Sequence, residues 1–215
     1  MGYSRAGFEV VGVDIKPQKN YPFEFHQADA MTYPLEGFEA IHASPPCQAY
    51  TPLKAMWNAR DHPELVDATR DRLIANGKPY VIENVPGSPV HGLTLCGSMF
   101  GLGTGDAELR RHRLFEIWPM FMLTPPCAHG QRPRTAGVSV DAGGSSTREK
   151  NKSRVIGVYG GHGRDRRRRT NTQGFSTDER REAMGIAWMN GNELSQAIPP
   201  VYTEYIGLRL REAMR

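Results

Sequence analysis

The sequence predicts an α/β fold with an open, mostly parallel sheet and a small irregular lobe added to one core. Three observations favour this fold. Short apolar runs alternate with amphipathic segments, as in proteins whose parallel strands are joined by helices. Several of these runs end in a polar residue or a proline, which is typical of buried strands that open onto loops. The length of 215 residues and the hydrophobic content of 39% are sufficient for one full core.

The predicted strands are the apolar runs in chain order. FEVVGVDI contains Asp14 near its end, FEAIHAS runs into the Pro45-Pro46 pair, and KPYVIENVPG is stopped by Pro86-Gly87. HRLFEIW is a further strand candidate, and RVIGVY is a short strand within a basic stretch. Strands of this length between turn residues indicate a sheet whose carboxyl ends carry loops.

Three segments are predicted to be helical. HPELVDATRDRLIANG has apolar residues at helical spacing and Gly77 in the position of a C-terminal cap. STDERREAMG opens with Ser176 and has Glu179 three residues later, which is the pattern of a capping box. VYTEYIGLRLREAM is predicted to be the closing helix.

The stretch from 118 to 174 interrupts this alternation, because it is rich in Pro, Gly, Ser and Arg and has no long amphipathic segment. We therefore predict a core in residues 1–117, a separate lobe in 118–174, and C-terminal helices in 175–215 that complete the core. Long irregular insertions in compact domains are usually functional.

Composition limits the class of protein. Three cysteines are too few for a disulfide scaffold, and no apolar run approaches the length of a membrane helix. No signal-peptide pattern is present at the N-terminus. We expect a soluble, monomeric protein of the cytoplasm with no membrane partner.

The net charge of +4 is concentrated in one region, which contains Arg164 and the run Arg166, Arg167, Arg168 and Arg169. A dense basic block is typical of a surface that binds nucleic-acid phosphates. A solvated or disordered loop is the competing interpretation of the same composition.

Candidate reactive residues follow three predicted strands, where open α/β sheets bind ligands. Asp14 ends the first strand and is placed to bind a ribose hydroxyl, Cys47 follows the second, and Glu83-Asn84 ends the third. A thiol held by two prolines can act as a nucleophile once it is deprotonated, and a desolvated acid can donate a proton. Taken singly, Cys47 could equally be a small buried residue and Glu83 a surface strand terminus.

The ordered motifs SPPCQ, ENVPG, RHRLFE and IPPVYTEYIG resemble those of the DNA (cytosine-5) methyltransferase family. The resemblance runs from Tyr3 to Leu208 outside the lobe, and the pair PPCQ and ENV is its most specific part. It implies an S-adenosylmethionine-dependent methyltransferase with a Rossmann-like sheet, acting on double-stranded DNA. It also implies a short phage or prophage enzyme that acts in the cytoplasm of a bacterial host cell and protects DNA from restriction.

The resemblance implies catalytic roles. The target cytosine is flipped out of the duplex, Cys47 attacks C6, and Glu83 holds and protonates N3. Asn84 orders the pocket, and Arg111 and Arg113 support the base and the thiolate. The glutamine that usually stands two residues before this arginine pair is Leu109 here.

The resemblance also implies binding residues. Asp14 would hold the cofactor ribose and Asp29 the adenine amino group, with Ile15, Pro45 and Gln196 completing the cofactor site. Gln196 stands where the family has an asparagine. Gln48 and the arginines Arg164 and Arg166 to Arg169 would contact DNA, with the lobe in the position of the target-recognition region.

The first segment departs from the family. MGYSRAGFEVV resembles the helix after the Gly-rich cofactor loop, and that loop and the strand before it are not found in the sequence. Two explanations stay open, an upstream start of translation, which we favour, or a loss of normal cofactor binding. TPPCAH repeats the PPC pattern at Cys127 but lacks the following glutamine.

Two further alternatives concern metal and substrate. Cys127, His129 and His162 contain zinc-ligand residue types, but their spacing is weak and we expect no metal. A non-catalytic DNA-binding relative and an RNA cytosine-5 methyltransferase remain the competing functions.

Overall fold

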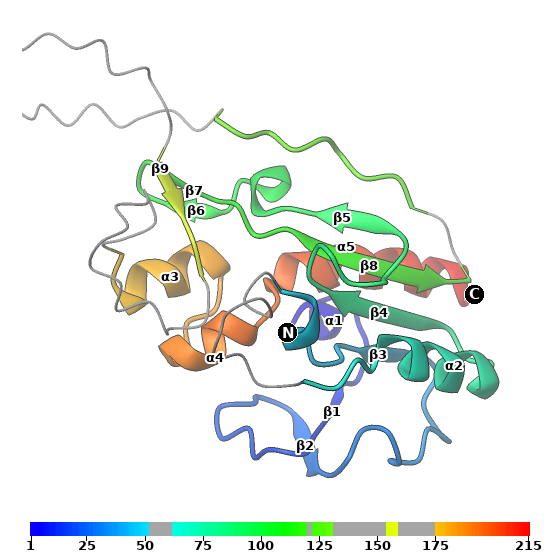
Figure 1. Ribbon diagram of the computed structural model, residues 1–215. Helices are drawn as coiled ribbons and strands as arrows, with labels where there is room; N and C mark the ends of the chain where they lie inside the picture. Colours follow the sequence, from blue (N-terminus) through cyan, green and yellow to red (C-terminus); the bar gives the residue numbers. More distant parts are fainter. Residues whose placement is uncertain (52–61, 120–121, 131–153, 159–174) are drawn as a thin grey trace, which may run out of the picture. The chain divides into compact units, whose positions relative to one another are not determined.

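The computed structural model describes residues 1–51, 62–119, 122–130, 154–158 and 175–215 (Figure 1). The chain forms two compact units. The first contains Met1–Leu95, His112–Pro125 and Pro200–Arg215. The second contains Cys96–Arg111 and Pro126–Pro199. Arg164 and the run Arg166 to Arg169 lie outside the described residues, as does His162.

The first unit contains two sheets. In the smaller sheet, β1 (Val11–Asp14) pairs in parallel with β2 (Glu24–Gln27). The larger sheet has the order β3-β4-β8-β5. Its strands are β3 (Ile41–Ala43), β4 (Tyr80–Asn84), β5 (Leu93–Leu95) and β8 (Arg113–Trp118).

The predicted strands are present, but the sheets are mixed rather than mostly parallel. β3 pairs with β4 in parallel, whereas β8 runs antiparallel to both β4 and β5. Parallel neighbours need a long crossover, usually a helix. No α-helix is described between β4 and β8, so this part of the chain returns in the opposite direction. The structure is therefore a mixed α/β fold.

The core of the first unit surrounds β4, all of whose residues are buried. Helix α2 (Val66–Asn76) contributes Val66 and Leu73 to a cluster with Ile82. The predicted C-terminal cap of this helix is confirmed, since Gly77 has φ +70° and its backbone N–H donates to the carbonyl oxygens of Leu73 and Ile74. Glu83 and Asn84, the last two residues of β4, are therefore buried with the rest of the strand.

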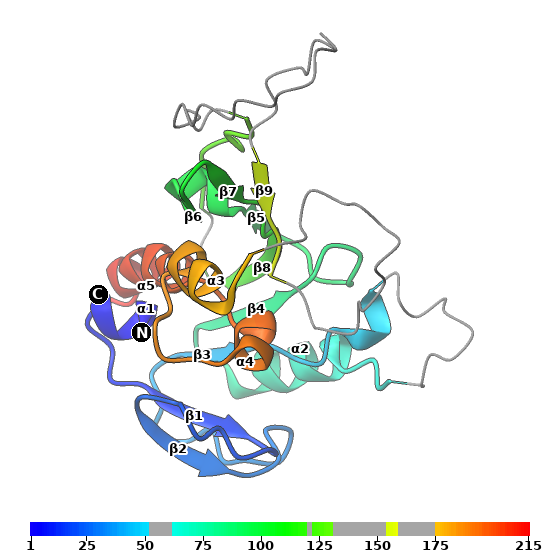
Figure 2. The same ribbon diagram turned by 90° about the vertical axis from the view of Figure 1, so that its left-hand side faces the viewer.

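The short helix α1 (Gly2–Arg5) lies against the closing helix α5 (Pro200–Ala213), and both views show the two together (Figures 1 and 2). Two glycines allow this close approach. A Cβ at Gly2 would lie 2.1 Å from the Pro200 carbonyl oxygen, and one at Gly207 would lie 2.9 Å from Ala6 Cβ. None of the helices described is long and apolar enough to cross a membrane.

The second unit has its own three-stranded sheet, in the order β6-β7-β9. Its strands are β6 (Gly103–Thr104), β7 (Ala107–Leu109) and β9 (Arg154–Ile156), and its helices are η3 (Gly97–Phe100), α3 (Thr177–Met184) and α4 (Gly191–Gln196). The capping box predicted for α3 is confirmed, because the Ser176 side chain accepts from the Glu179 N–H and the Glu179 carboxylate accepts from the Ser176 N–H.

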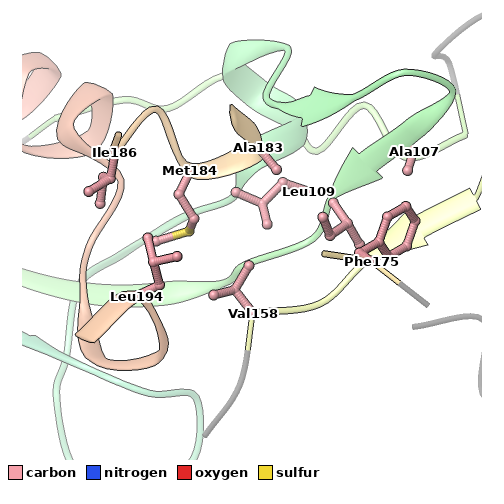
Figure 3. Packing of buried hydrophobic residues seen from close by; sticks show 9 residues of the cluster. Ala107, Leu109, Val158, Phe175, Ala183, Met184, Ile186 and Leu194 are labelled. Carbon is pink, nitrogen blue, oxygen red and sulfur yellow. The ribbon is translucent and has the colours of Figure 1, made fainter. Parts of the chain in front are cut away.

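The two units do not follow the predicted boundaries. Figure 3 shows Leu109, Val158, Met184 and Leu194 pointing toward one another in the second unit, where all four are buried. Residues 96–111 and 175–199 therefore share one apolar core, although the sequence analysis assigned both to the larger domain. A shared core is formed by contacts between distant segments, and the composition of each segment does not predict these contacts.

Candidate active site

Cys47 stands on a short loop after β3. The chain leaves the strand through Ser44, Pro45 and Pro46, and Cys47 then precedes the single 3-10 turn η1 (Gln48–Tyr50). The Cys47 carbonyl oxygen accepts a hydrogen bond of 3.0 Å from the Tyr50 N–H. Two prolines with fixed φ precede this turn, so the half-buried thiol has a well-defined backbone.

Asn84 connects the end of β4 to this loop. Its side-chain N–H donates to the Pro45 carbonyl oxygen at 2.9 Å, and its Oδ1 accepts from the Val85 N–H at 2.9 Å. The following turn approaches the same loop, because a Cβ at Gly87, where φ is +96°, would lie 3.3 Å from the Tyr50 carbonyl oxygen. The structure thus brings together the segments around Cys47 and Asn84, as the sequence analysis expected for neighbouring strand ends.

Glu83 and Arg113 form an ion pair on neighbouring strands. Arg113 Nε lies 2.8 Å from Glu83 Oε1, and the two side chains are 11% and 9% exposed. The antiparallel register sets Glu83 opposite Phe115, so Arg113 is its diagonal neighbour. Such diagonal pairs are within reach of long side chains. The guanidinium compensates the charge of a carboxylate that has almost no access to water.

A hydrogen-bonded chain reaches Ser44, at the start of the segment that leads from β3 to Cys47. The sequence analysis did not predict it. The Tyr3 hydroxyl is 2.7 Å from His42 Nδ1, and His42 Nε2 is 3.1 Å from Ser44 Oγ. Exclusion of water, with the charge of Glu83, raises the pKa of Tyr3, and exclusion of water lowers the pKa of His42 to about 4. A protonated Tyr3 hydroxyl therefore donates to a neutral imidazole, which donates in turn to Ser44.

The two arginines predicted as a pair have different surroundings. Arg111 belongs to the second unit, where its guanidinium donates to the backbone carbonyls of Val158, Ser195 and Ala197. The last two distances are 2.8 and 2.7 Å. Arg111 is therefore a buried clamp that holds the backbone on both sides of Gln196. Its predicted support of the base and thiolate stays a prediction.

Asp14, Ile15 and Asp29, which were proposed to bind the cofactor, stand at the carboxyl edge of the small parallel sheet. Asp14 ends β1, and its carboxylate accepts from the Lys16 N–H at 2.8 Å and from the Gln18 side chain at 3.0 Å. Ile15 is 65% exposed, which is unusual for a large apolar side chain. The Asp14 carbonyl accepts from the Ala28 N–H at 3.1 Å, which brings the loop that carries Asp29 to the same edge.

The remaining candidates are more dispersed. Gln48 is exposed at the start of η1, and Gln196 is the exposed last residue of α4 in the second unit.

The sequence analysis missed Cys96, which lies close to Cys127 and His129. The available signal was a Cys-x-His pair with a second cysteine upstream. The sequence analysis considered only His162 as the third ligand of a metal.

The chain was compared with protein-family models, with curated protein sequences and with solved structures, and none of the three comparisons finds a match.

Proposed function

We propose that this protein is a DNA (cytosine-5) methyltransferase that uses S-adenosylmethionine. One observation carries the proposal. Three motifs far apart in the sequence contribute to one constellation in the first unit, with Asn84 bonded to the Pro45 carbonyl two residues before Cys47 and Glu83 paired with Arg113. A thiol, a buried acid and its cation are the groups that attack on a pyrimidine ring requires.

The arrangement of strands supports the same proposal. A doubly wound fold has the strand order 3-2-1-4-5, and its ligand binds outside the carboxyl ends where the order reverses. Figures 1 and 2 both show the β1–β2 sheet next beyond β3, the edge strand of the β3-β4-β8-β5 sheet. In this order, β2 and β1 would correspond to strands 3 and 2, and β3 and β4 to strands 4 and 5. No described strand stands between β1 and β3, where strand 1 of that order would be.

The edge formed by Asp14, Ile15 and Asp29 fits a nucleoside. An adenosine offers ribose hydroxyls and an amino group as donors and an aromatic face as apolar surface. The carboxylates of Asp14 and Asp29 are acceptors, and the exposed Ile15 side chain gives an apolar surface beside them. Pro45 and Gln196 remain further candidates. When bound, S-adenosylmethionine would supply the methyl group.

The chemistry follows from the residues of the first unit. The Cys47 thiolate would add to C6 of a cytosine flipped out of the duplex, forming a covalent bond. Glu83, oriented by Arg113, would give a proton to N3 as the thiolate adds and would take it back when the thiolate leaves, so that no full negative charge builds up on the ring. C5 then becomes nucleophilic and takes up the methyl group. Transfer of the C5 proton to water and departure of Cys47 from C6 would then restore the aromatic ring and the thiolate.

Double-stranded DNA is the proposed substrate. The basic block at Arg164 and Arg166 to Arg169 is the sequence feature that supports it, because clustered arginines bind phosphates. Protection of phage DNA from restriction is the corresponding biological role. An RNA substrate would use the same thiol chemistry, so the substrate must be identified by experiment.

The test is transfer of a radiolabelled methyl group from S-adenosylmethionine to duplex DNA of mixed sequence, with transfer RNA assayed in parallel. We expect label on DNA cytosine with the native chain and none with Cys47→Ser. Asp71→Asn, an exposed change on α2, is the control and should keep the activity.

Duplex DNA containing 5-fluorocytosine gives an independent measurement. Fluorine at C5 cannot leave as a proton does, so the protein should remain covalently attached to the DNA through Cys47. Labelling of RNA alone would replace the DNA substrate. A folded chain that binds DNA without methyl transfer or adduct would favour the non-catalytic alternative.

A further inference from the structure

A second group of reactive side chains lies wholly within the second unit. Cys96 Sγ is 3.3 Å from His129 Nε2. The ligand atoms of Cys96, Cys127 and His129 all lie within 4.8 Å of one another. None of these residues belongs to the constellation around Cys47.

The backbone holds these three residues in place from two directions. Cys96 is buried immediately before η3, and its carbonyl oxygen accepts from the Met99 N–H at 3.1 Å. On the other segment, the Gly130 N–H donates to the buried Glu108 carboxylate at 2.8 Å. Strand β7, which carries Glu108, therefore anchors the segment that contains Cys127 and His129.

The separations match those of ligands around a tetrahedral zinc ion. With Zn–S of about 2.3 Å and Zn–N of about 2.0–2.1 Å, neighbouring ligand atoms lie about 3.6–3.8 Å apart. The observed distance of 3.3 Å and the upper limit of 4.8 Å bracket this value, so shifts of less than about 1 Å would complete the geometry. Two thiols and an imidazole are also the donors that zinc prefers to calcium or magnesium.

We propose that Cys96, Cys127 and His129 bind a structural zinc ion. Ser98 supports the site, because its hydroxyl donates to Cys96 Sγ at 3.3 Å, and such outer hydrogen bonds orient and stabilise a thiolate ligand. The site is independent of methyl transfer, since none of its ligands has a role in the proposed reaction.

The ion would join two segments of the second unit that are separated in the sequence. Cys96 opens the segment Cys96–Arg111, whereas Cys127 and His129 lie near the start of Pro126–Pro199. A metal that bridges such segments restricts the unfolded chain as a disulfide does, and its binding free energy contributes to folding. Zinc thus gives a small apolar core an additional cross-link.

The competing arrangement is a disulfide between Cys96 and Cys127, because their sulfur atoms lie within 4.8 Å of each other. No disulfide is present among the three cysteines of the chain. A disulfide would leave His129 and Ser98 without any contribution to the cross-link, whereas a zinc site uses both. The two arrangements therefore predict different effects of replacing His129.

The experiment measures the metal content of the full chain, purified in a reducing buffer without chelators. We expect one zinc ion per chain, and a tetrahedral Co²⁺ spectrum with a thiolate-to-metal charge-transfer band after exchange. Cys127→Ser and His129→Ala should each weaken zinc binding by more than roughly 100-fold, since replacing an outer partner alone typically lowers affinity 10–100-fold. Both residues are exposed, which limits the effect of the substitutions on folding.

Ser98→Ala is a graded variant and should weaken binding by roughly 10–100-fold. Cys47→Ser is the matched control, and it should retain the full zinc content and the cobalt spectrum. Circular dichroism of every variant separates loss of metal from loss of fold. X-ray absorption should show two sulfur neighbours and an imidazole nitrogen at the zinc.

Three results would overturn the proposal. One is a folded native chain that holds no zinc and gives no thiolate band with cobalt. Another is a zinc content that survives in both Cys127→Ser and His129→Ala. The third is mass-spectrometric evidence for a Cys96–Cys127 disulfide in protein purified without oxidant. A methyltransferase assay is not needed for any of them, so failure here leaves the proposed function untouched.

Discussion

Arg113 Nε lies 2.8 Å from Glu83 Oε1, and the antiparallel β4–β8 register places the two residues as diagonal neighbours within reach of each other. Both side chains are nearly inaccessible to water. Removing one partner of such a pair leaves an uncompensated charge in a site of low dielectric constant. The pair therefore links the stability of the sheet to the group that we propose for catalysis.

Arg113→Ala should destabilise the protein by about 3–5 kcal/mol, because Glu83 would lose its cation. Urea denaturation checks this value. The double variant Arg113→Ala with Glu83→Gln should recover much of the stability, since the buried charge is then absent, but not methyl transfer. Arg209→Ala is the control, because its helical pair with Glu212 is more than half exposed and should change stability by less than about 0.5 kcal/mol. Equal destabilisation by both arginine variants would contradict the argument.

Asn84→Ala tests the link between the strand end and the Cys47 loop. The variant loses the donor to the Pro45 carbonyl and should be destabilised by about 1–2 kcal/mol. Methyl transfer should fall by a larger factor than stability explains, because the thiol would no longer be held in one position. Asn84→Asp is the sharper comparison, since a carboxylate in place of the amide would repel the same carbonyl oxygen. Full activity in either variant would show that Asn84 does not position Cys47.

His42 gives the fold a pH dependence on the acidic side of neutrality. Its pKa is about 4 in the folded chain, below the ordinary value of 6.5. Between these two values the unfolded chain binds more protons than the folded one, so stability is highest above pH 6.5 and falls as the pH drops toward 4. The loss should be at most about 3.4 kcal/mol.

Denaturation at a series of pH values, with the His42 ring followed by NMR, measures this effect. His42→Asn should flatten the profile in that interval, since an amide can accept from Tyr3 without titrating. Tyr3→Phe removes the hydroxyl partner and leaves the imidazole in place, so it should keep the pH dependence. An imidazole that titrates at its ordinary pKa would contradict the exclusion of water from His42.

Local signals in the sequence explain which elements could be predicted. β4 and α2 were found from apolar spacing, and the ends of α2 and α3 from Gly77 and from the Ser176 and Glu179 pair. Each of these signals acts within about one turn of chain, where propensity and capping dominate. The proximity of Asn84 to the loop that carries Cys47 was also predictable, because this loop follows β3 and Asn84 ends the adjacent parallel strand β4.

Features that depend on long-range pairing were not predictable. The direction of β8 is set by its partners β4 and β5 and not by its own residues. Arg111 and Arg113 are two residues apart, yet one clamps backbone carbonyls in the second unit and the other pairs with Glu83. Cys96 becomes a neighbour of His129 only through the fold of the second unit. Composition and spacing carry no information on these contacts.

S-adenosylmethionine binding is the prediction that decides most about the proposed function. Calorimetric titration into the full chain should show a dissociation constant on the order of micromolar, about −8 kcal/mol of binding free energy. Asp14→Asn and Asp29→Asn should each weaken it roughly 10–100-fold, because hydrogen bonds to a charged acceptor are worth about 1.5–3 kcal/mol. Asp71→Asn, an exposed acid on α2, is the matched control and should leave the affinity unchanged. If a folded chain shows no binding, the edge at Asp14, Ile15 and Asp29 does not hold the cofactor, and a DNA-binding protein without methyl transfer becomes the better explanation of the Cys47 constellation.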